Sequence, residues 1–255
     1  MSGILLHLLG WTATVVYGDT LKFDRWCWLR RHLRVGGYRT LDAGCGSGSF
    51  AIYSATRGNE TVGISYDKSQ LQTARSQSST LGIGNLAFFL ADLRDLDQIS
   101  LQLGAFDQVI CFETIEHILD DDKLIGDLGT LLIPGGQLLL VTPSRQCRPM
   151  LGDRVSDTED GGHVRWGYTH YELQTLLRRH GLEVVVAEYV SGVISQQITN
   201  LFRVLSLGRA GSTWATIAWL LTFPLRTFQF FDPALTKLLN YPHMSVAVVG
   251  SKPSE

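Results

Sequence analysis

Two short runs of residues have types and spacings that could bind a cofactor and assist a reaction. The first spans residues 41–48 (LDAGCGSG), with three glycines at alternate positions between a strand-like start and a helix-like continuation. Glycine lets the backbone amides at a helix N-terminus approach a ligand closely. The spacing is GxGxG, not the GxGxxG of a dinucleotide site, and Asp42 disfavours a pyrophosphate. These residues therefore predict a ligand that carries positive charge.

The second run, Phe112-Glu113-Thr114-Ile115-Glu116-His117, follows a predicted strand over residues 106–111. A neutral imidazole is a suitable base at physiological pH when the reacting group is a hydroxyl. We predict that Glu116 and His117 begin a helix and that His117 is the general base. The alternative is a histidine that only bonds backbone at the helix start. Two carboxylates and an imidazole also suit a divalent cation, although we predict no metal.

The glycine run resembles the first motif of the class I S-adenosylmethionine (SAM) methyltransferases, whose Rossmann-like fold holds the methionine end of SAM over this loop. The resemblance covers residues 37–190 and 243–252, and it implies that SAM is the cofactor. By this resemblance Asp42 and Gly44 lie near the SAM amino group and the methionine backbone. Cys45 lies within the loop, and Gly46 and Gly48 keep the loop open.

Further cofactor residues are expected just after each strand, because ligands of such folds lie across the carboxyl ends of the strands. After strand two the family usually places an acid on the ribose, but this chain has Ser65. The cyclopropane-synthase and tocopherol-methyltransferase branches are similar in having a neutral residue there. Asp67 has the spacing of a helix N-cap, with Gln70 three residues later.

After strand three, Asp92 and Leu93 look like the family's adenine segment, in which the acid accepts a hydrogen bond from the exocyclic amine. The alternative for Asp92 is a helix N-cap. Phe112 and Glu113 are expected to line the sulfonium end of SAM.

The Glu-x-x-Glu-His spacing also resembles ubiquinone-pathway O-methyltransferases and small-RNA 3′-terminal methyltransferases, in which these side chains can hold a divalent metal. His163 and His170 would be candidate further ligands. Residues 161–169 lie where many relatives close over the acceptor, and their glycines permit movement. Packing without acceptor contact is the alternative for this segment.

The predicted elements give an α/β fold with a seven-stranded, mostly parallel sheet covered by helices on both faces. Pro134-Gly135-Gly136 predicts a tight turn into strand five, and a helix over 169–180 is expected to end at Gly181. The resemblance implies that the last strand is antiparallel to the others. The predicted strands cover residues 38–42, 61–65, 86–90, 106–111, 137–142, 183–189 and 244–250.

Net charge and cysteine content argue against some classes of substrate and site. The 255 residues carry a net charge of -2, with a pI near 6.4, so nothing indicates a nucleic-acid substrate. The four cysteines form no CxxC pair, which argues against zinc or disulfides and predicts a cytoplasmic protein. Oligomeric state is not predictable.

The chain divides into an N-terminal helical arm (1–36), a SAM-binding core (37–190), an apolar insertion (191–242), and a last strand with a tail (243–255). Residues 2–18 have no charged side chain and are predicted to form a packing helix, not an export signal. Within the insertion, residues 210–225 are charge-free but too short to span a bilayer. We expect a lid over an apolar acceptor first, a membrane-interface segment second and a dimer face third.

Together these features predict a SAM-dependent methyltransferase that acts on a small, hydrophobic metabolite, with O-methylation favoured by His117. Peripheral membrane contact through the insertion is compatible with such an acceptor. The alternatives are an RNA methyltransferase and a SAM-binding interaction module without turnover. The absence of a basic groove opposes the first, and the retained Asp42, Gly44, Asp92 and His117 oppose the second.

Overall fold

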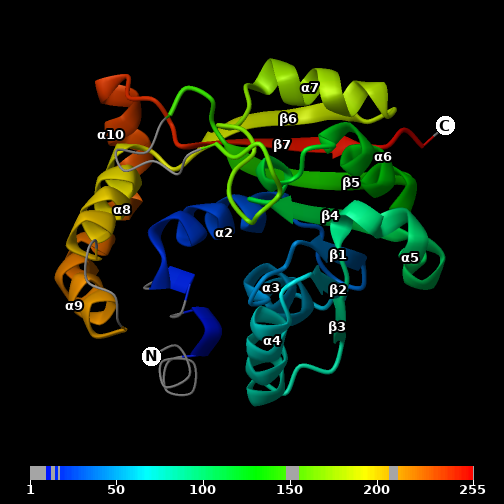
Figure 1. Cartoon of the computed structure of the whole chain (residues 1–255), viewed down its shortest axis with the longest axis horizontal. Helices are drawn as coiled ribbons and strands as arrows, with labels where there is room; N and C mark the ends of the chain where they lie inside the picture. The colour runs from blue at the N-terminus through cyan, green and yellow to red at the C-terminus, as the bar shows by residue number, and fades with distance from the viewer. Residues whose placement is uncertain (1–9, 13–14, 17, 148–154, 207–211, 255) are drawn as a thin grey trace.

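A computed structural model describes residues 10–12, 15–16, 18–147, 155–206 and 212–254 of the chain. One seven-stranded sheet has the order β3-β2-β1-β4-β5-β7-β6 (Figure 1), and only β7 runs against its neighbours. The α/β Rossmann-like fold and the antiparallel last strand are thereby confirmed. The strands are β1 Arg39–Ala43, β2 Glu60–Ser65, β3 Leu86–Leu90, β4 Phe106–Phe112, β5 Leu132–Pro143, β6 Glu183–Val190 and β7 Ser245–Ser251.

Helices connect these strands and also occupy the stretch between β6 and β7. The α-helices are α2 Thr20–His32, α3 Ser49–Thr56, α4 Lys68–Thr80, α5 Leu96–Leu103, α6 Asp121–Leu131, α7 His170–Arg179, α8 Val193–Ser206, α9 Ser212–Thr222 and α10 Asp232–Leu239. The 3-10 helices are η1 Leu93–Asp95, η2 Ile115–His117 and η3 Phe223–Phe231. In the described part of the chain, none of these helices is long and apolar enough to cross a membrane.

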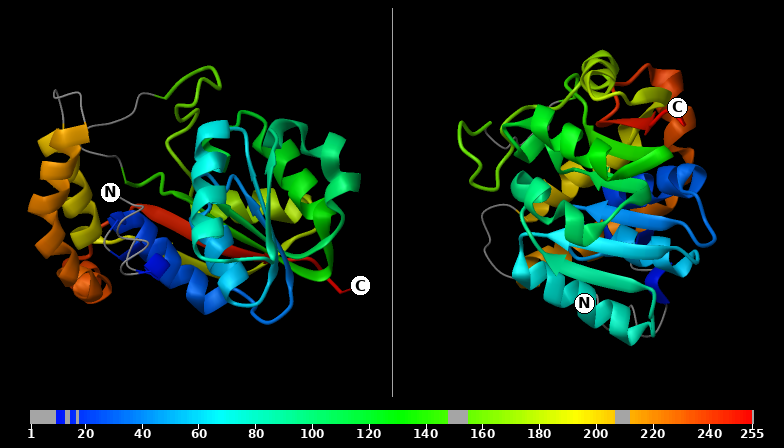
Figure 2. Two further views of the ribbon diagram at one scale, coloured as in Figure 1. Left: turned by 90° about the horizontal axis from the view of Figure 1, so that it is seen from below. Right: turned by 90° about the vertical axis from the view of Figure 1, so that its right-hand side faces the viewer.

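The central strands are apolar on both faces, which produces two separate cores. In β5, Leu138 and Leu140 pack with α5, α6 and α7, whereas Leu139 and Val141 pack with α2 and α3. Successive side chains of a strand point to opposite faces, so a nearly continuous apolar strand must be covered twice. Figure 2 shows the resulting layers of helix, sheet and helix.

Helix α2 brings the N-terminal part of the chain to the carboxyl end of the sheet. Asp19 caps it by accepting hydrogen bonds from the amides of Leu21 and Lys22. Its Trp28 is buried, and the Trp28 ring lies 5.8 Å from the ring of Phe112 at the end of β4. The predicted packing helix over residues 2–18 falls mostly outside the described residues.

Two local predictions are wrong, and tertiary pairing explains the first. Strand β5 begins at Leu132, not after a turn at residues 134–136, because Leu132 already pairs with Phe106 and the register then shifts before Gln137. Glu116 and His117 do not begin an α-helix. They form the short η2, and α6 starts only at Asp121, where the Asp120 side chain accepts from the Lys123 amide.

Two other local predictions are confirmed. The helix expected over 169–180 forms as α7, and Gly181 follows it with φ +70°. Thr169 and Glu172 also form a reciprocal capping box at its start. Asp67 caps α4 through the amides of Ser69 and Gln70.

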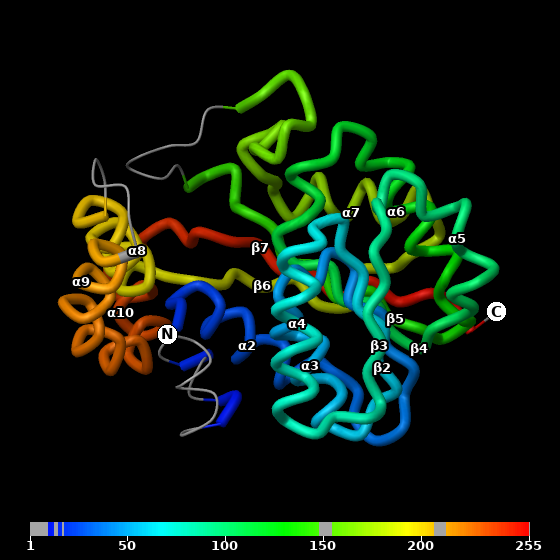
Figure 3. Tube along the Cα trace, turned by 60° about the horizontal axis from the view of Figure 1, so that its bottom comes forward, coloured from blue at the N-terminus to red at the C-terminus, as the bar shows by residue number. Residues whose placement is uncertain are grey.

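The described residues of 191–242 form a helical group made of α8, α9, η3 and α10, which lies beside α2 at one end of the molecule (Figure 3). Buried Asp232 holds the start of α8 by accepting from the amides of Gly192, Ile194 and Ser195. Gln229 donates to the Thr20 carbonyl, which joins this group to α2.

Candidate active site

A cavity of about 530 Å³ opens at the carboxyl ends of β1, β2, β3 and β4. Strands β2 and β4 flank β1, so the chain reverses its order there, and such a switch point is where open α/β sheets bind ligands. Seven predicted site residues line this cavity: Gly44, Gly46, Ser65, Asp92, Leu93, Glu113 and His117. The fold therefore brings most of the predicted site together.

The glycine loop is held against its surroundings too closely to admit side chains. Gly44 has φ +84°, and a Cβ there would overlap the Thr114 side chain. A Cβ on Gly46, at φ +52°, would lie 2.6 Å from Gln70 Oε1. The amides of Gly44 and Cys45 both donate to the Ile64 carbonyl, which fixes the loop against β2. Glycine is thus required by space and by φ at Gly44, and it is favoured by φ at Gly46, where the end of the Gln70 side chain could move.

Four predicted cofactor residues lie outside the cavity wall. Cys45 is buried behind the loop, and Gly48 is the N-cap residue of α3 with φ +80°. Phe112 packs on the rings of Trp28 and Phe50. The fourth is Asp42, and the cofactor roles of all four stay predictions.

Asp42 is buried beneath the loop with little to stabilise its charge. Its side chain is hydrogen-bonded by the Ala51 amide, and its Oδ2 has no partner among the described residues. Burial raises the pKa of Asp42 to about 7, and the bond from Ala51 opposes that rise. An uncompensated acid under this loop suits a ligand with a positive charge.

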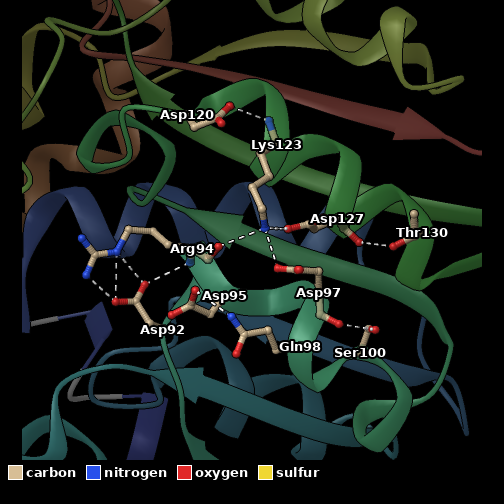
Figure 4. Close-up of polar contacts among 10 residues, drawn as sticks. All are labelled: Asp92, Arg94, Asp95, Asp97, Gln98, Ser100, Asp120, Lys123, Asp127 and Thr130. Atoms are coloured by element: carbon tan, nitrogen blue, oxygen red, sulfur yellow. Dashed lines mark hydrogen bonds and ion pairs between the residues drawn. The ribbon is translucent and has the colours of Figure 1, made fainter.

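Asp92 caps the 3-10 helix η1, which was the alternative prediction for this residue. Its side chain accepts from the Arg94 amide and forms an ion pair with the Arg94 guanidinium (Figure 4). Arg94 also contacts Glu159 at 2.8 Å, and Glu159 accepts from the Leu119 amide. This chain of contacts ties the predicted adenine segment to the loop that precedes α7. An additional bond from Asp92 to adenine stays a prediction.

Ser65 faces the cavity at the end of β2, where its hydroxyl accepts from the Asp67 amide at 3.2 Å. No carboxylate therefore occupies the usual ribose position. Ribose binding by Ser65 stays a prediction.

Glu113 has an unusual backbone conformation, and the two oxygens of its carboxylate have different surroundings. Its φ is +49°, a conformation that costs energy for a side chain of this size. One oxygen pairs with Arg25 of α2 at 3.2 Å, and the other has no partner among the described residues. Burial raises the pKa of Glu113, and Arg25 opposes this rise. The unpartnered oxygen is a further acceptor suited to a cationic cofactor.

Beside Glu113, Glu116 is fully buried and accepts from the Thr142 hydroxyl at 3.1 Å. Burial and the nearby Glu113 charge raise the pKa of Glu116 well above its usual range. His117 lies 2.9 Å from the Gly162 carbonyl through Nδ1. A carbonyl only accepts, so Nδ1 carries the proton and the Nε2 of neutral His117 keeps its lone pair.

A possible metal set differs from the one that the sequence indicated. Ligand atoms of Glu116, His117 and His163 all lie within 4.8 Å of one another, and such a mixed nitrogen and oxygen set fits a borderline divalent cation. Glu113 is paired with Arg25 instead, and His170 is bonded to the Glu188 carbonyl. The prediction of no metal remains a prediction.

The segment before α7 is attached to η2. The Val164 amide donates to the Glu116 carbonyl, and Arg165 donates to the carbonyls of Ile115 and Ile118. Gly161 lines the cavity. Contact of this segment with an acceptor stays a prediction.

Several lining residues were not predicted. Tyr66 and Thr114 immediately follow β2 and β4, so the rule of inspecting each strand end could have found them. Glu159 and Asp160 follow no strand directly, and Glu159 is held at the cavity by Arg94, 65 positions earlier in the chain. No local signal identifies them.

Comparison with known proteins identifies the family of this chain. A family model described as a methyltransferase domain matches residues 35–198. A ubiquinone biosynthesis O-methyltransferase of Chromobacterium violaceum is 32% identical over 133 residues, 52% of this chain and 55% of the relative. One of Xanthomonas euvesicatoria pv. vesicatoria is 30% identical over 181 residues, 68% of this chain and 73% of the relative. The chain spans about half the length of several of these relatives.

Solved structures show the same fold. The [4+2]-cyclase SpnF superposes with a TM-score of 0.62 at 22% identity, covering 91% of this chain and 81% of its own. Coclaurine N-methyltransferase, bound to N-methylheliamine and SAH, gives 0.57 at 16% identity, covering 89% of this chain and 71% of its own. The chain belongs to the methyltransferase-domain family, that of the class I SAM-dependent methyltransferases. Its cofactor is SAM.

Proposed function

We propose that this protein transfers a methyl group from SAM to a hydroxyl oxygen of a small, hydrophobic metabolite. The observation that carries the proposal is the His117 imidazole, which lines the same cavity as the glycine loop and whose Nδ1 is bonded to the Gly162 carbonyl. The names of the similar proteins, ubiquinone biosynthesis O-methyltransferases, support oxygen as the acceptor atom.

The residues of this chain would position the acceptor and remove its proton. SAM supplies an electrophilic methyl carbon, and alignment of the attacking oxygen with the S–CH3 bond contributes most to the rate. When the acceptor hydroxyl is methylated, its proton would pass to His117 Nε2, which would then carry the positive charge. The Gly162 carbonyl holds the ring through Nδ1, and Oε1 of Glu116 lies 4.0 Å from Nε2.

The insertion supports an apolar acceptor and contact with a membrane surface. Leu220, Leu221, Phe230 and Leu238 are all more than half exposed on its helices. Asp232 is the single acid of residues 191–242, and it is buried. An exposed apolar surface without acidic side chains suits peripheral binding from the cytoplasm to anionic lipid.

The test replaces His117 by alanine. We expect turnover to fall by ~10² to 10⁴ while SAM affinity changes less than twofold, because a general base acts on the acceptor and not on the cofactor. A labelled-SAM assay on fractionated lipid and metabolite extract identifies the acceptor, and calorimetry gives the affinity. His170→Ala is the control, since His170 is bonded to Glu188 on β6. Near-normal turnover of the His117 variant would contradict the proposal.

A further inference from the structure

A second cavity, of about 1020 Å³, lies between α2, the end of β6 and the segment from η3 to residue 243. None of the described residues lines both this cavity and the active-site cavity. Residues of one stripe of α2 line the second cavity, including Asp24 and Trp28, whereas Arg25 reaches Glu113 at the active site. Helix α2 thus separates two different cavities.

Two polar groups of the second cavity have no internal partner. The Ser191 side chain is buried at 6% exposure, and its hydroxyl makes no hydrogen bond among the described residues. Oδ2 of Asp24 is likewise buried and makes no hydrogen bond among the described residues, although the Ser191 and Ser195 hydroxyls lie close enough to the carboxyl to lower its pKa. Ser191 has φ +61°, a strained conformation of the kind that accumulates at ligand sites. Buried polar atoms without partners are costly, so both atoms call for a ligand.

The remaining charges around the cavity are compensated or exposed. Glu188 pairs with Arg31 at 2.9 Å, and Asp232 accepts from three backbone amides of the α8 start. Lys237 lies on the exposed side of α10. His243 also lines the cavity, where burial lowers its pKa and Asp232 opposes this, so it is neutral at pH 8. Among the described residues, Asp24 is therefore the acid of this cavity without an ion-paired partner, since the groups beside its carboxyl are the Ser191 and Ser195 hydroxyls and Arg25 pairs with Glu113. A cation would compensate it.

The walls around Asp24 are apolar and aromatic. Phe23, Trp28 and Phe230 line the cavity, and Phe230 is 70% exposed, so the lining continues onto the outer face of the insertion. The face of an aromatic ring attracts cations, and it also packs against apolar groups. A ligand with a cationic head and an apolar tail could place the head at Asp24 and the tail along Phe230.

We propose that this second cavity binds a protonated amine carried on an apolar body, with Asp24 as its counter-ion and Ser191 as an acceptor for a second N–H. This site is separate from the SAM cavity and goes beyond the proposed function. It does not depend on which acceptor is methylated.

The test compares three probes of equal chain length: octylammonium, octanol and octanoate. Calorimetry on the full chain at pH 8, with S-adenosylhomocysteine saturating the active site, measures each affinity. We expect octylammonium to bind at least tenfold more tightly than octanol, and octanoate to bind more weakly still. Equal binding of the three probes would show simple adhesion to the apolar face and would overturn the proposal. So would octylammonium binding that is strong without S-adenosylhomocysteine and lost when S-adenosylhomocysteine is present.

Asp24→Asn removes the charge at constant size. We expect roughly a tenfold to hundredfold loss of octylammonium affinity, the range for a hydrogen bond to a charged group. Glu183→Gln, an exposed acid at the other end of β6, is the control and should change nothing. An unchanged affinity of the Asp24 variant would refute the site.

The pH dependence gives a test that needs no variant. Burial raises the pKa of Asp24 to about 7, and the nearby charge of Asp232 adds to this rise. The Ser195 and Ser191 hydroxyls and the charge of Arg25 lower the pKa and so oppose it. The alkylammonium stays protonated throughout. Octylammonium affinity should therefore fall about tenfold from pH 8 to pH 6, because fewer carboxylates are ionised. Affinity that stays constant over this range contradicts the assignment even if the Asp24 variant does not fold.

Discussion

Replacing Asp42 by asparagine should stabilise the protein without cofactor, and the gain should grow with pH. Asp42 is 1% exposed, and burial raises its pKa from 3.8 to about 7. The folded state therefore binds the Asp42 proton more tightly than the unfolded state does. Between these two values, stability falls as pH rises, and it levels off above pH 7.

The magnitude follows from the difference between the two pKa values. About three pKa units correspond to at most roughly 4 kcal/mol of lost stability at alkaline pH, of which roughly 2.5 kcal/mol develops between pH 5 and pH 8.5. Asparagine has the same shape, keeps an oxygen for the Ala51 amide and carries no charge. The variant should thus match the parent protein near pH 4 and exceed its stability at pH 8.5.

Urea unfolding without SAM, followed by tryptophan fluorescence, measures the free energy of unfolding at pH 5 and pH 8.5. Other buried acids affect the parent and the variant alike, so the difference between them isolates Asp42. Asp97→Asn is the control, because Lys123 holds the pKa of exposed Asp97 below its usual value and the expected sign reverses. An Asp42 variant that is no more stable than the parent at pH 8.5 would contradict a raised pKa of Asp42. By the family resemblance the same variant should lose SAM affinity, so stability and cofactor binding would change in opposite directions.

Three further predictions concern the cofactor, the metal and the insertion. Asp92→Ala should weaken SAM binding by roughly tenfold in calorimetry, the value of one lost hydrogen bond, and unchanged affinity would leave Asp92 a helix cap only. Activity should survive EDTA; loss that magnesium or manganese restores would instead assign a metal to Glu116, His117 and His163. The protein should float with anionic liposomes, and a short polar linker in place of residues 210–225 should abolish flotation while SAM affinity stays near normal. Equal flotation of both proteins would contradict the membrane role of this segment.

Local sequence signals were sufficient for the strands and for the glycine loop. A strand covered on both faces must be apolar along its length. A loop position where a Cβ would overlap a neighbouring side chain must be glycine, and Gly44 is such a position. Helix caps such as Asp67 and Thr169 were predictable for the same reason, because capping involves residues only three positions apart.

The features that the sequence did not predict depend on residues far apart in the chain. Arg25 and Glu113 are 88 positions apart, and Arg94 reaches Glu159 over 65 positions. The early start of β5 at Leu132 depends on pairing with Phe106 of another strand. The second cavity likewise joins α2 to a helix more than 200 residues later, so no motif indicates it.

The position of β7 between β5 and β6 has a consequence for folding during synthesis. The ribosome releases β6 well before β7, yet β6 pairs only with β7. The nascent chain can assemble β1 to β5, but β6 must wait until the helical segments of the insertion and then β7 have emerged. During that interval the edge of β5 that pairs with β7 is uncovered, which is a state prone to aggregation. A chain that stopped before Ser245 would lose two strands of the sheet instead of one.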